Sequence, residues 1–298
     1  MRVLIVGCGY VGLPLGRELV RQGHAVFGLR RSRLAEAELQ AAGVTPLHAD
    51  ITQPETLAAL PHTFDWVVNC TASGGGSTED YRQVYWEGTR HLLAWLANSP
   101  PRKYVYTSST SVYGQNDGSI VTEASPAIPE ASTGQILVET EKLLLAAAAQ
   151  SFPAVILRVA GIYGPGRGHW FKAFLRGEAR IEGDGSRALN MIHRDDLIGI
   201  IIAALQDAKP GEIFNAVDNE AVIQLQFFEW LAAQLQRPLP PRVEANAETW
   251  RKRGVTNKRV SNAKLHAELK YSFQYPDFRA GYGEELRRMQ AEGHLEIS

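Results

Sequence analysis

Short apolar runs alternate with longer, partly polar stretches along the first half of the chain. Each run has the length of a β-strand, is rich in Val, Ile and aromatic residues, and is apolar at successive positions. The runs are RVLIVG (residues 2–7), AVFGLR (25–30), VTPLHA (44–49), DWVVNC (65–70), KYVYTSS (103–109) and AVILRVA (154–160). Strands of this kind are covered on both faces, as in parallel sheets. The pattern predicts an α/β fold with a doubly wound parallel sheet.

A seventh candidate strand, EIFNAV at residues 212–217, lies far along the chain from the other six. From about residue 164 the regular alternation gives way to a Gly-rich loop and to polar stretches that carry Pro and charge. We therefore expect about seven strands in a domain formed by residues 1–165, which also recruits about 190–218. The remainder of 166–298 is expected to form a smaller C-terminal lobe that binds the substrate.

The first predicted strand runs into a glycine-rich turn, GCGYVG, and a helical pattern follows at once. Gly7 suits the tight turn, Gly9 lets a pyrophosphate approach the backbone, and Gly12 lets the helix pack closely on the strand. The free N–H groups at the start of the helix attract phosphate. Strand, loop and helix in this order predict a Rossmann-type dinucleotide site, and a merely structural turn is the alternative. We interpret Cys8, inside the loop, as a small filler.

The end of the second predicted strand distinguishes between two dinucleotides. An acidic residue there would bind the 2′-hydroxyl of the adenosine ribose, whereas arginine would accept a 2′-phosphate. The sequence has Arg30 and Arg31 at this point and no carboxylate, which favours NADP(H) over NAD(H), unless both arginines are simply solvated. Asp50 and Ile51 follow the third strand, where they would meet the adenine, although Asp50 also suits a turn.

The composition leaves a small molecule as the expected substrate. The chain has 31 Lys and Arg against 32 Asp and Glu, so neither nucleic acid nor an anionic membrane is an expected partner. No signal peptide is apparent, and no apolar run approaches the roughly 18 residues that span a bilayer. The two cysteines, Cys8 and Cys70, form no metal-binding pattern. These features predict a cytoplasmic protein without a metal site.

Several later motifs, taken together with the glycine loop, resemble one family. They are YTSSTSVYG, LRVAGIYGPG, NMIHRDDLIGIIIAAL and GEIFNAVDN, and they resemble the extended short-chain dehydrogenase/reductase family of nucleotide-sugar epimerases and dehydratases. The resemblance implies that Ser109 bonds the reacting hydroxyl or carbonyl and that Ser111 faces the substrate. A hydroxyl at the carboxyl end of a sheet strand does point toward the ligand crevice, but a loop cap is the alternative. The further cofactor residues that the resemblance implies are Tyr10, Val11, Thr71 and Ala72.

The family's acid/base pair, YxxxK, is absent from the helix that begins near PEASTGQILVETEKLL. Its two positions hold Thr133 and Leu137, as in an atypical branch of the family. A threonine hydroxyl is too weak an acid to replace tyrosine, and Leu137 can neither lower a pKa nor bind the nicotinamide ribose. The stretch suits a scaffold helix, with Ser132 and Gln135 as an S-x-x-Q capping box. Thr133 would then only orient a ligand.

A substitute proton donor is expected elsewhere along the cleft. Tyr81, in the loop after the fourth strand, is the first candidate, and a structural role is the alternative for each. The other candidates are Tyr113, Tyr163, His169 and His193. For His193, a place beside the acidic start of a helix explains the HRDD motif better than catalysis does. In the C-terminal lobe, Lys258 and Arg259 suit an anionic substrate group such as a diphosphate, unless the stretch mainly caps a helix.

The sequence is compatible with two functions. The first is an NADP(H)-dependent oxidoreductase or epimerase-like enzyme in which Ser109 orients the substrate, because hydride transfer itself needs mainly correct placement. The second is a catalytically silent NADP(H)-binding sensor or partner-binding protein, as Thr133 and Leu137 suggest. Helices over residues 78–98 and 135–150 match the pair that forms dimer contacts in related proteins. Their apolar surfaces suit either a homodimer or the core of one chain.

Overall fold

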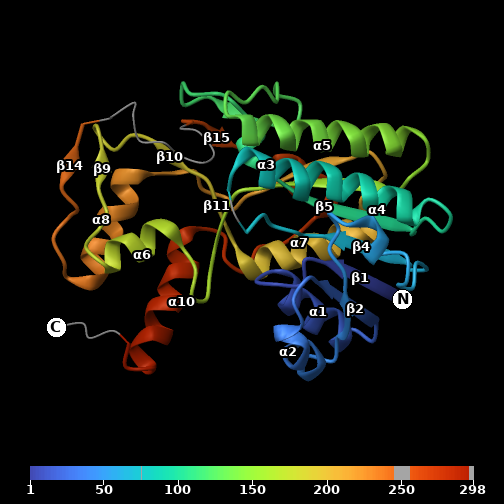
Figure 1. The fold of residues 1–298 in the computed structure, drawn as a ribbon. Coiled ribbons are helices and arrows are strands. Elements are labelled where there is room, and N and C mark those ends of the chain that lie inside the picture. Colours follow the sequence, from blue (N-terminus) through green and yellow to red (C-terminus); the bar gives the residue numbers. More distant parts are fainter. Residues whose placement is uncertain (75, 245–255, 295–298) are drawn as a thin grey trace.

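The computed structural model describes residues 1–74, 76–244 and 256–294, and its centre is one parallel sheet (Figure 1). Seven strands lie in the order β12-β7-β5-β4-β1-β2-β3, and every neighbouring pair is parallel. The strands are β1 Arg2–Val6, β2 Ala25–Arg30, β3 Thr45–His48, β4 Trp66–Asn69, β5 Lys103–Ser109, β7 Ala154–Val159 and β12 Ile213–Ala216. This confirms the predicted fold class, including the late seventh strand.

The strand order reverses next to β1, in the middle of the sheet. From β1 the chain moves outward through β2 to β3 and then returns to place β4 on the other side of β1. A crevice forms at such a switch point, outside the carboxyl ends of the strands. The glycine loop follows β1 directly, so the topology places it at the crevice.

Helices cover both faces of the sheet (Figure 1). One face carries α1 Gly12–Arg21, α2 Glu36–Ala41 and α7 Arg194–Asp207; the other carries α3 Thr78–Tyr81, α4 Gly88–Leu96 and α5 Ser132–Ala149. A π-helical segment, Arg82–Glu87, joins α3 to α4. Leu144 of α5 is fully buried within this chain. The homodimer expected from the helices over residues 78–98 and 135–150 stays a prediction.

The remaining elements surround a second group of buried side chains. Its helices are α6 His169–Leu175, α8 Gln224–Leu235 and α10 Phe278–Ala291, which bury Phe171, Phe227, Phe228 and Tyr282 against one another. The helix α9, Ala263–Leu269, lies instead against β12 and α7. The short strand pairs are β6 Ile120–Val121 with β15 Arg259–Val260, β8 Gly161–Tyr163 with β11 Met191–His193, β9 Ile181–Glu182 with β14 Arg242–Val243, and β10 Ala188–Leu189 with β13 Val222–Ile223. The predicted domain boundary at residue 165 stays a prediction.

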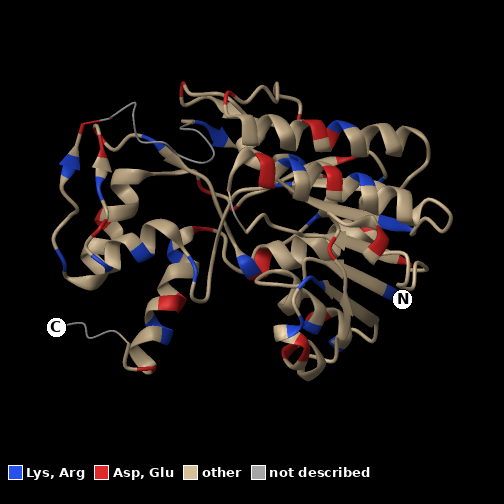
Figure 2. Cartoon of the chain, in the orientation of Figure 1, with Lys and Arg blue, Asp and Glu red and all other residues tan. Residues whose placement is uncertain are grey.

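Charged residues of both signs are interspersed over the described elements (Figure 2). Within the described ranges, no helix has the length and hydropathy that crossing a membrane requires. The same ranges contain no group of His, Cys, Asp and Glu side chains that could hold a metal ion.

Candidate functional site

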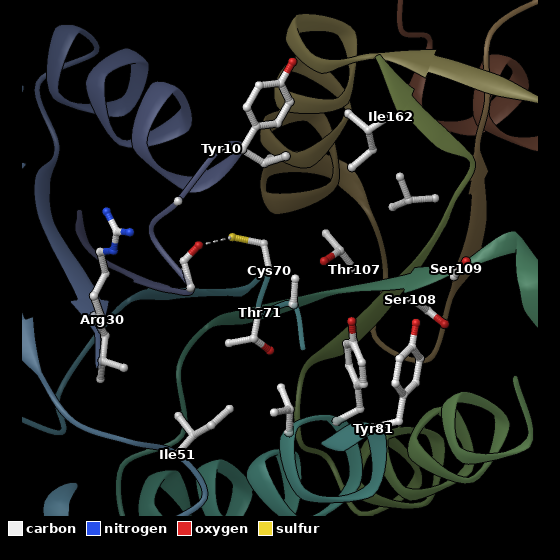
Figure 3. A pocket seen from close by; sticks show the side chains of 18 of the residues that line it. Tyr10, Arg30, Ile51, Cys70, Thr71, Tyr81, Thr107, Ser108, Ser109 and Ile162 are labelled. Atoms are coloured by element: carbon white, nitrogen blue, oxygen red, sulfur yellow. Dashed lines mark hydrogen bonds between the residues drawn. The ribbon is translucent and has the colours of Figure 1, made fainter. Parts of the chain in front are cut away.

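A cavity of about 370 Å³ lies at the carboxyl ends of β1, β2, β4 and β5 (Figure 3). We call it the first cavity. It brings together all of the predicted cofactor residues except Gly12, which lies behind the loop. Those that line it are Gly7, Gly9, Tyr10, Val11, Arg30, Arg31, Asp50, Ile51, Thr71 and Ala72. Segments far apart in the sequence therefore form one site where the topology predicts a crevice.

The glycine loop has the geometry that a bound pyrophosphate requires. Gly7 has φ +84°, and a Cβ there would lie 2.7 Å from the Thr71 backbone. A Cβ at Gly12 would lie 2.8 Å from the Gly7 carbonyl oxygen, so this position also excludes a side chain. At Gly9 the nearest atom to such a Cβ is 4.0 Å away, which leaves the loop open on the cavity side. The loop thus fits a phosphate group held on backbone N–H groups.

Two cysteines lie beside this loop, and both have structural surroundings. Burial raises the pKa of the Cys8 thiol to about 12, which keeps it protonated and agrees with its role as a filler. The Cys70 thiol lies 3.4 Å from the carbonyl oxygen of Gly7 (Figure 3), in a hydrogen bond that supports the turn.

The far end of the first cavity carries the two arginines after β2. Arg30 is half-buried and extends along the cavity wall (Figure 3), whereas the Arg31 side chain is 62% exposed. Arg31 Nη1 lies 3.8 Å from Asp50 Oδ2. Asp50 Oδ1 accepts hydrogen bonds from the backbone N–H and the hydroxyl of Thr52, so Asp50 both forms a turn and borders the cavity.

The other end of the first cavity is formed by hydroxyl groups. Ser108 and Ser109 line it at the end of β5, and Tyr81 and Tyr85 line it from the opposite side. Figure 3 shows Tyr81 pointing from its helix toward Ser108. The rings of Tyr81 and Tyr85 lie 4.9 Å apart between centroids, and both are buried. Ser109 Oγ accepts a hydrogen bond of 3.2 Å from the Ser111 N–H.

The two residues at the positions of the family's acid/base pair, Thr133 and Leu137, differ in their access to the first cavity. Leu137 lines the first cavity. Thr133 is 5% exposed and lines neither the first cavity nor a second one that adjoins it. The expected capping box is wrong. The N-cap of α5 is Ala131, and no side chain caps it. The Ser132 hydroxyl instead lies 3.0 Å from that of Thr78 on α3, and Gln135 Nε2 donates to the Pro129 carbonyl in the loop before α5, so both side chains have other partners.

Two of the other candidate proton donors already have structural roles. The Tyr113 hydroxyl donates to Asn215 and accepts from Arg158, and burial raises its pKa. His193 Nδ1 accepts the Asp195 N–H and so begins α7, as the HRDD motif indicates. Burial lowers the pKa of His193. Tyr163 and His169 line a different cavity.

A buried polar network that the sequence motifs did not indicate lies behind the hydroxyl end of the first cavity. Ser108 Oγ donates to Glu141 Oε1 at 2.6 Å, and Arg158 Nη2 donates to Glu141 Oε2 at 2.7 Å. Glu141 follows Leu137 by one helical turn. The sequence signal was Arg158 itself, because a charge inside the apolar run AVILRVA requires a buried partner.

A second cavity, of about 230 Å³, adjoins the first. The two share Ser109, Ala160 and Ile162 as lining residues, so Ser109 stands at their boundary. Ser111 and Lys258 also line the second cavity, together with Arg187, which the sequence did not indicate. Arg259 is exposed and does not line it.

The loop after β8 connects the two cavities. Arg167 lines the first cavity, and its guanidinium lies 4.9 Å from the centre of the Tyr10 ring. Arg194 lies 5.3 Å from the same ring, and the Tyr10 hydroxyl donates to the Pro165 carbonyl. Tyr10 of the glycine loop is thus held by residues that lead into the C-terminal lobe.

Comparisons with known proteins agree with this arrangement. The model of the NAD dependent epimerase/dehydratase family matches residues 3–216. Protein YeeZ of Escherichia coli K12 is 30% identical over 290 residues, covering 93% of this chain and 97% of that protein. The 2-alkyl-3-oxoalkanoate reductase of Stenotrophomonas maltophilia is 28% identical over 223 residues, covering 71% of this chain and 67% of that protein.

A solved structure shares the fold across the whole length. DesIV, a dTDP-glucose 4,6-dehydratase from Streptomyces venezuelae solved with NAD and TYD bound, superposes with a TM-score of 0.83 at 22% identity, covering 99% of both chains. The family resemblance that the motifs suggested is confirmed, and the chain belongs to the NAD dependent epimerase/dehydratase family.

Proposed function

We propose that this protein is an NADP(H)-dependent oxidoreductase that acts on the hydroxyl or carbonyl group of a small molecule. One observation carries the proposal: Ser109 lies at the boundary between the first cavity, which has the dinucleotide loop, and the second cavity, which is free for a substrate. The dinucleotide supplies or accepts the hydride. Ser109 would hold the oxygen of the reacting group at the point where the two cavities meet.

The preference for NADP(H) rests on Arg30 and Arg31. Both line the first cavity at the end of β2, where a carboxylate would favour NAD(H). Asp50 lies near Arg31 but comes from the loop after β3, and its Oδ1 is occupied by the turn that it forms with Thr52. A guanidinium remains the group best placed to meet a 2′-phosphate.

Tyr81 is the group that we propose to deliver the proton to the substrate oxygen. It lines the first cavity on the side opposite Ser108 and Ser109, and it comes from a helix whose start is held by a Ser77–Asp80 capping box. Thr133, the alternative on α5, lines neither cavity. A buried phenol next to a cationic nicotinamide is a suitable general acid.

The test is oxidation of NADPH by a panel of carbonyl compounds, followed by absorbance. Ser109→Ala should abolish the turnover and leave NADPH affinity nearly unchanged, whereas Ser99→Ala, remote from both cavities, should behave as the parent. Turnover that survives Ser109→Ala contradicts the proposed role of Ser109.

A non-enzymatic NADP(H)-binding protein is the second candidate, and Leu137 is the observation that favours it. An apolar side chain borders the first cavity at the position where the family has its lysine. Tight NADPH binding without turnover of nucleotide sugars or carbonyl compounds would select this candidate.

A further inference from the structure

The second cavity is lined by a buried lysine that has no anionic partner among the residues that the structure describes. Lys258 is 4% exposed, and its ammonium donates to the Tyr113 carbonyl at 2.7 Å and to the Thr256 hydroxyl at 2.7 Å. Both acceptors are neutral. Within the described ranges, no carboxylate forms an ion pair with Lys258.

Arg187 places a second cation on the wall of the same cavity. Its Nη1 donates to Glu182 at 3.1 Å, and its guanidinium lies 5.5 Å from the centre of the Trp170 ring. Its Nε is buried and has no hydrogen-bond partner. Glu182 therefore balances at most one of the two positive charges, and one donor of Arg187 stays unused.

A third unsatisfied group comes from the loop after β5. The Ser111 Oγ is buried without a hydrogen-bond partner and belongs to a residue that lines the second cavity. An uncompensated buried charge and an unpaired buried donor each cost free energy unless water, an ion or a ligand completes them. Burial and, to a smaller extent, the positive charge of Arg187 lower the pKa of Lys258 to about 8.

We propose that the second cavity binds the oxyanionic group of the substrate, a carboxylate or a phosphate, between Lys258, Arg187 and Ser111. The three groups require the same thing, an acceptor oxygen that carries negative charge. The proposal rests on the proposed function only in calling this ligand the substrate. The site itself is defined by Arg187 and Lys258, which come directly before β10 and β15, and by Ser111 in the loop after β5.

The position of the site restricts the substrate further. The second cavity meets the first at Ser109, so the oxyanion and the reacting hydroxyl or carbonyl belong to one molecule that extends from Lys258 to Ser109. Tyr163, Leu189 and Met191 also line the cavity, so this part of its wall suits an apolar segment between these two ends.

Binding of two simple probes, inorganic phosphate and acetate, tests the proposal without any turnover. Calorimetric titrations use the full chain saturated with NADP⁺, so that phosphate cannot occupy the first cavity. The parent should bind at least one probe saturably in the millimolar range. Lys258→Met should weaken this binding by about 30-fold or more, and Arg187→Gln should weaken it as well.

Arg259→Met is the matched control, because Arg259 is the next residue in the chain, is exposed and lies outside the cavity. It should leave the dissociation constant unchanged. Near-ultraviolet circular dichroism checks that each variant is folded, and Lys258→Met should melt at a higher temperature than the ligand-free parent, since it removes an uncompensated charge.

Two results would overturn the proposal: a parent that binds neither probe, or a folded Lys258→Met variant that binds both as tightly as the parent. Because no reaction is followed, a chain that binds the probes at Lys258 and oxidises no NADPH would refute the proposed function while leaving this site intact. Binding of phosphate without acetate would identify a phosphate-bearing substrate, and the reverse would identify a carboxylate.

Discussion

Arg158 and Glu141 form an ion pair of 2.7 Å in which both side chains are almost completely buried, with 6% and 3% of their surfaces exposed. The pair joins α5 to β7 and holds Ser108 through a hydrogen bond of 2.6 Å to Glu141. It thereby supports the end of β5 from behind, one residue before Ser109.

Breaking this ion pair should destabilise the chain strongly. Arg158→Met leaves the Glu141 carboxylate buried without its partner, at a cost of about 3 to 5 kcal/mol in the free energy of unfolding. Urea unfolding followed by circular dichroism measures the loss. The exposed pair Arg82–Glu139 is the control, because Arg82→Met should cost about 0 to 1 kcal/mol. Equal effects of the two substitutions would show that burial does not decide the strength.

Replacing the arginines after β2 should change the choice of cofactor. Arg30→Met and Arg31→Met each remove a charged donor from the first cavity, so NADPH binding should weaken by about 10- to 100-fold while NADH binding hardly changes. Fluorescence titration of both nucleotides gives the ratio. Arg33→Met, on the exposed turn that follows, serves as control. A parent that binds NADH more tightly than NADPH would refute the assignment.

Tyr81→Phe should lower kcat and spare cofactor binding. Loss of a general acid costs about 10²- to 10⁴-fold in rate, and the phenyl ring preserves the contact with Tyr85. Steady-state kinetics together with NADPH titration separate the two effects. Tyr85→Phe is the comparison, because Tyr85 lines the same cavity and its ring lies against that of Tyr81. If Tyr85→Phe abolishes turnover and Tyr81→Phe does not, the proton comes from Tyr85.

Lys258 should make both stability and acetate binding depend on pH. Its pKa falls from 10.5 to about 8 on folding, so between these values the unfolded chain binds more protons than the folded chain. Below pH 8 the destabilisation by the buried charge of Lys258 is fully present. The free energy of unfolding of the ligand-free protein should therefore rise as pH increases from about 8 to 10.5. Acetate needs the ammonium and should bind more weakly over the same interval.

The comparison of Lys258→Met with the parent isolates this effect. Burial lowers the pKa of Arg187 as well, but a guanidinium starts from an ordinary pKa above 12. The two hydrogen-bond acceptors of Lys258, the Tyr113 carbonyl and the Thr256 hydroxyl, do not titrate between pH 8 and 10.5. Thermal melts and acetate titrations at several pH values give the two profiles. If melting temperature and acetate affinity depend on pH in the same way in Lys258→Met and in the parent, Lys258 is not the titrating group.

The sequence predicted what depends on local pattern and failed where distant segments meet. Apolar runs identified all seven strands, and strand, loop and helix in order identified Gly7, Gly9 and Gly12. The capping box failed because Ser132 and Gln135 satisfy the local rule but find better partners in neighbouring segments. Neither Arg187 nor its proximity to Lys258 was predictable, because about 70 residues and several short strands separate the two in the chain.

The Tyr10 ring lies against both Arg167 and Arg194, and we expect these contacts to make binding in one cavity depend on binding in the other. A dinucleotide that orders the glycine loop would also fix Tyr10, and through Arg167 it would fix the chain that leads to the second cavity. If NADP⁺ changes the affinity for acetate by some factor, acetate must change the affinity for NADP⁺ by the same factor, because linkage is reciprocal. The dissociation constant of each ligand, measured with and without the other ligand, gives the coupling free energy. If the other ligand leaves each constant unchanged within error, the Tyr10 ring does not couple the two cavities.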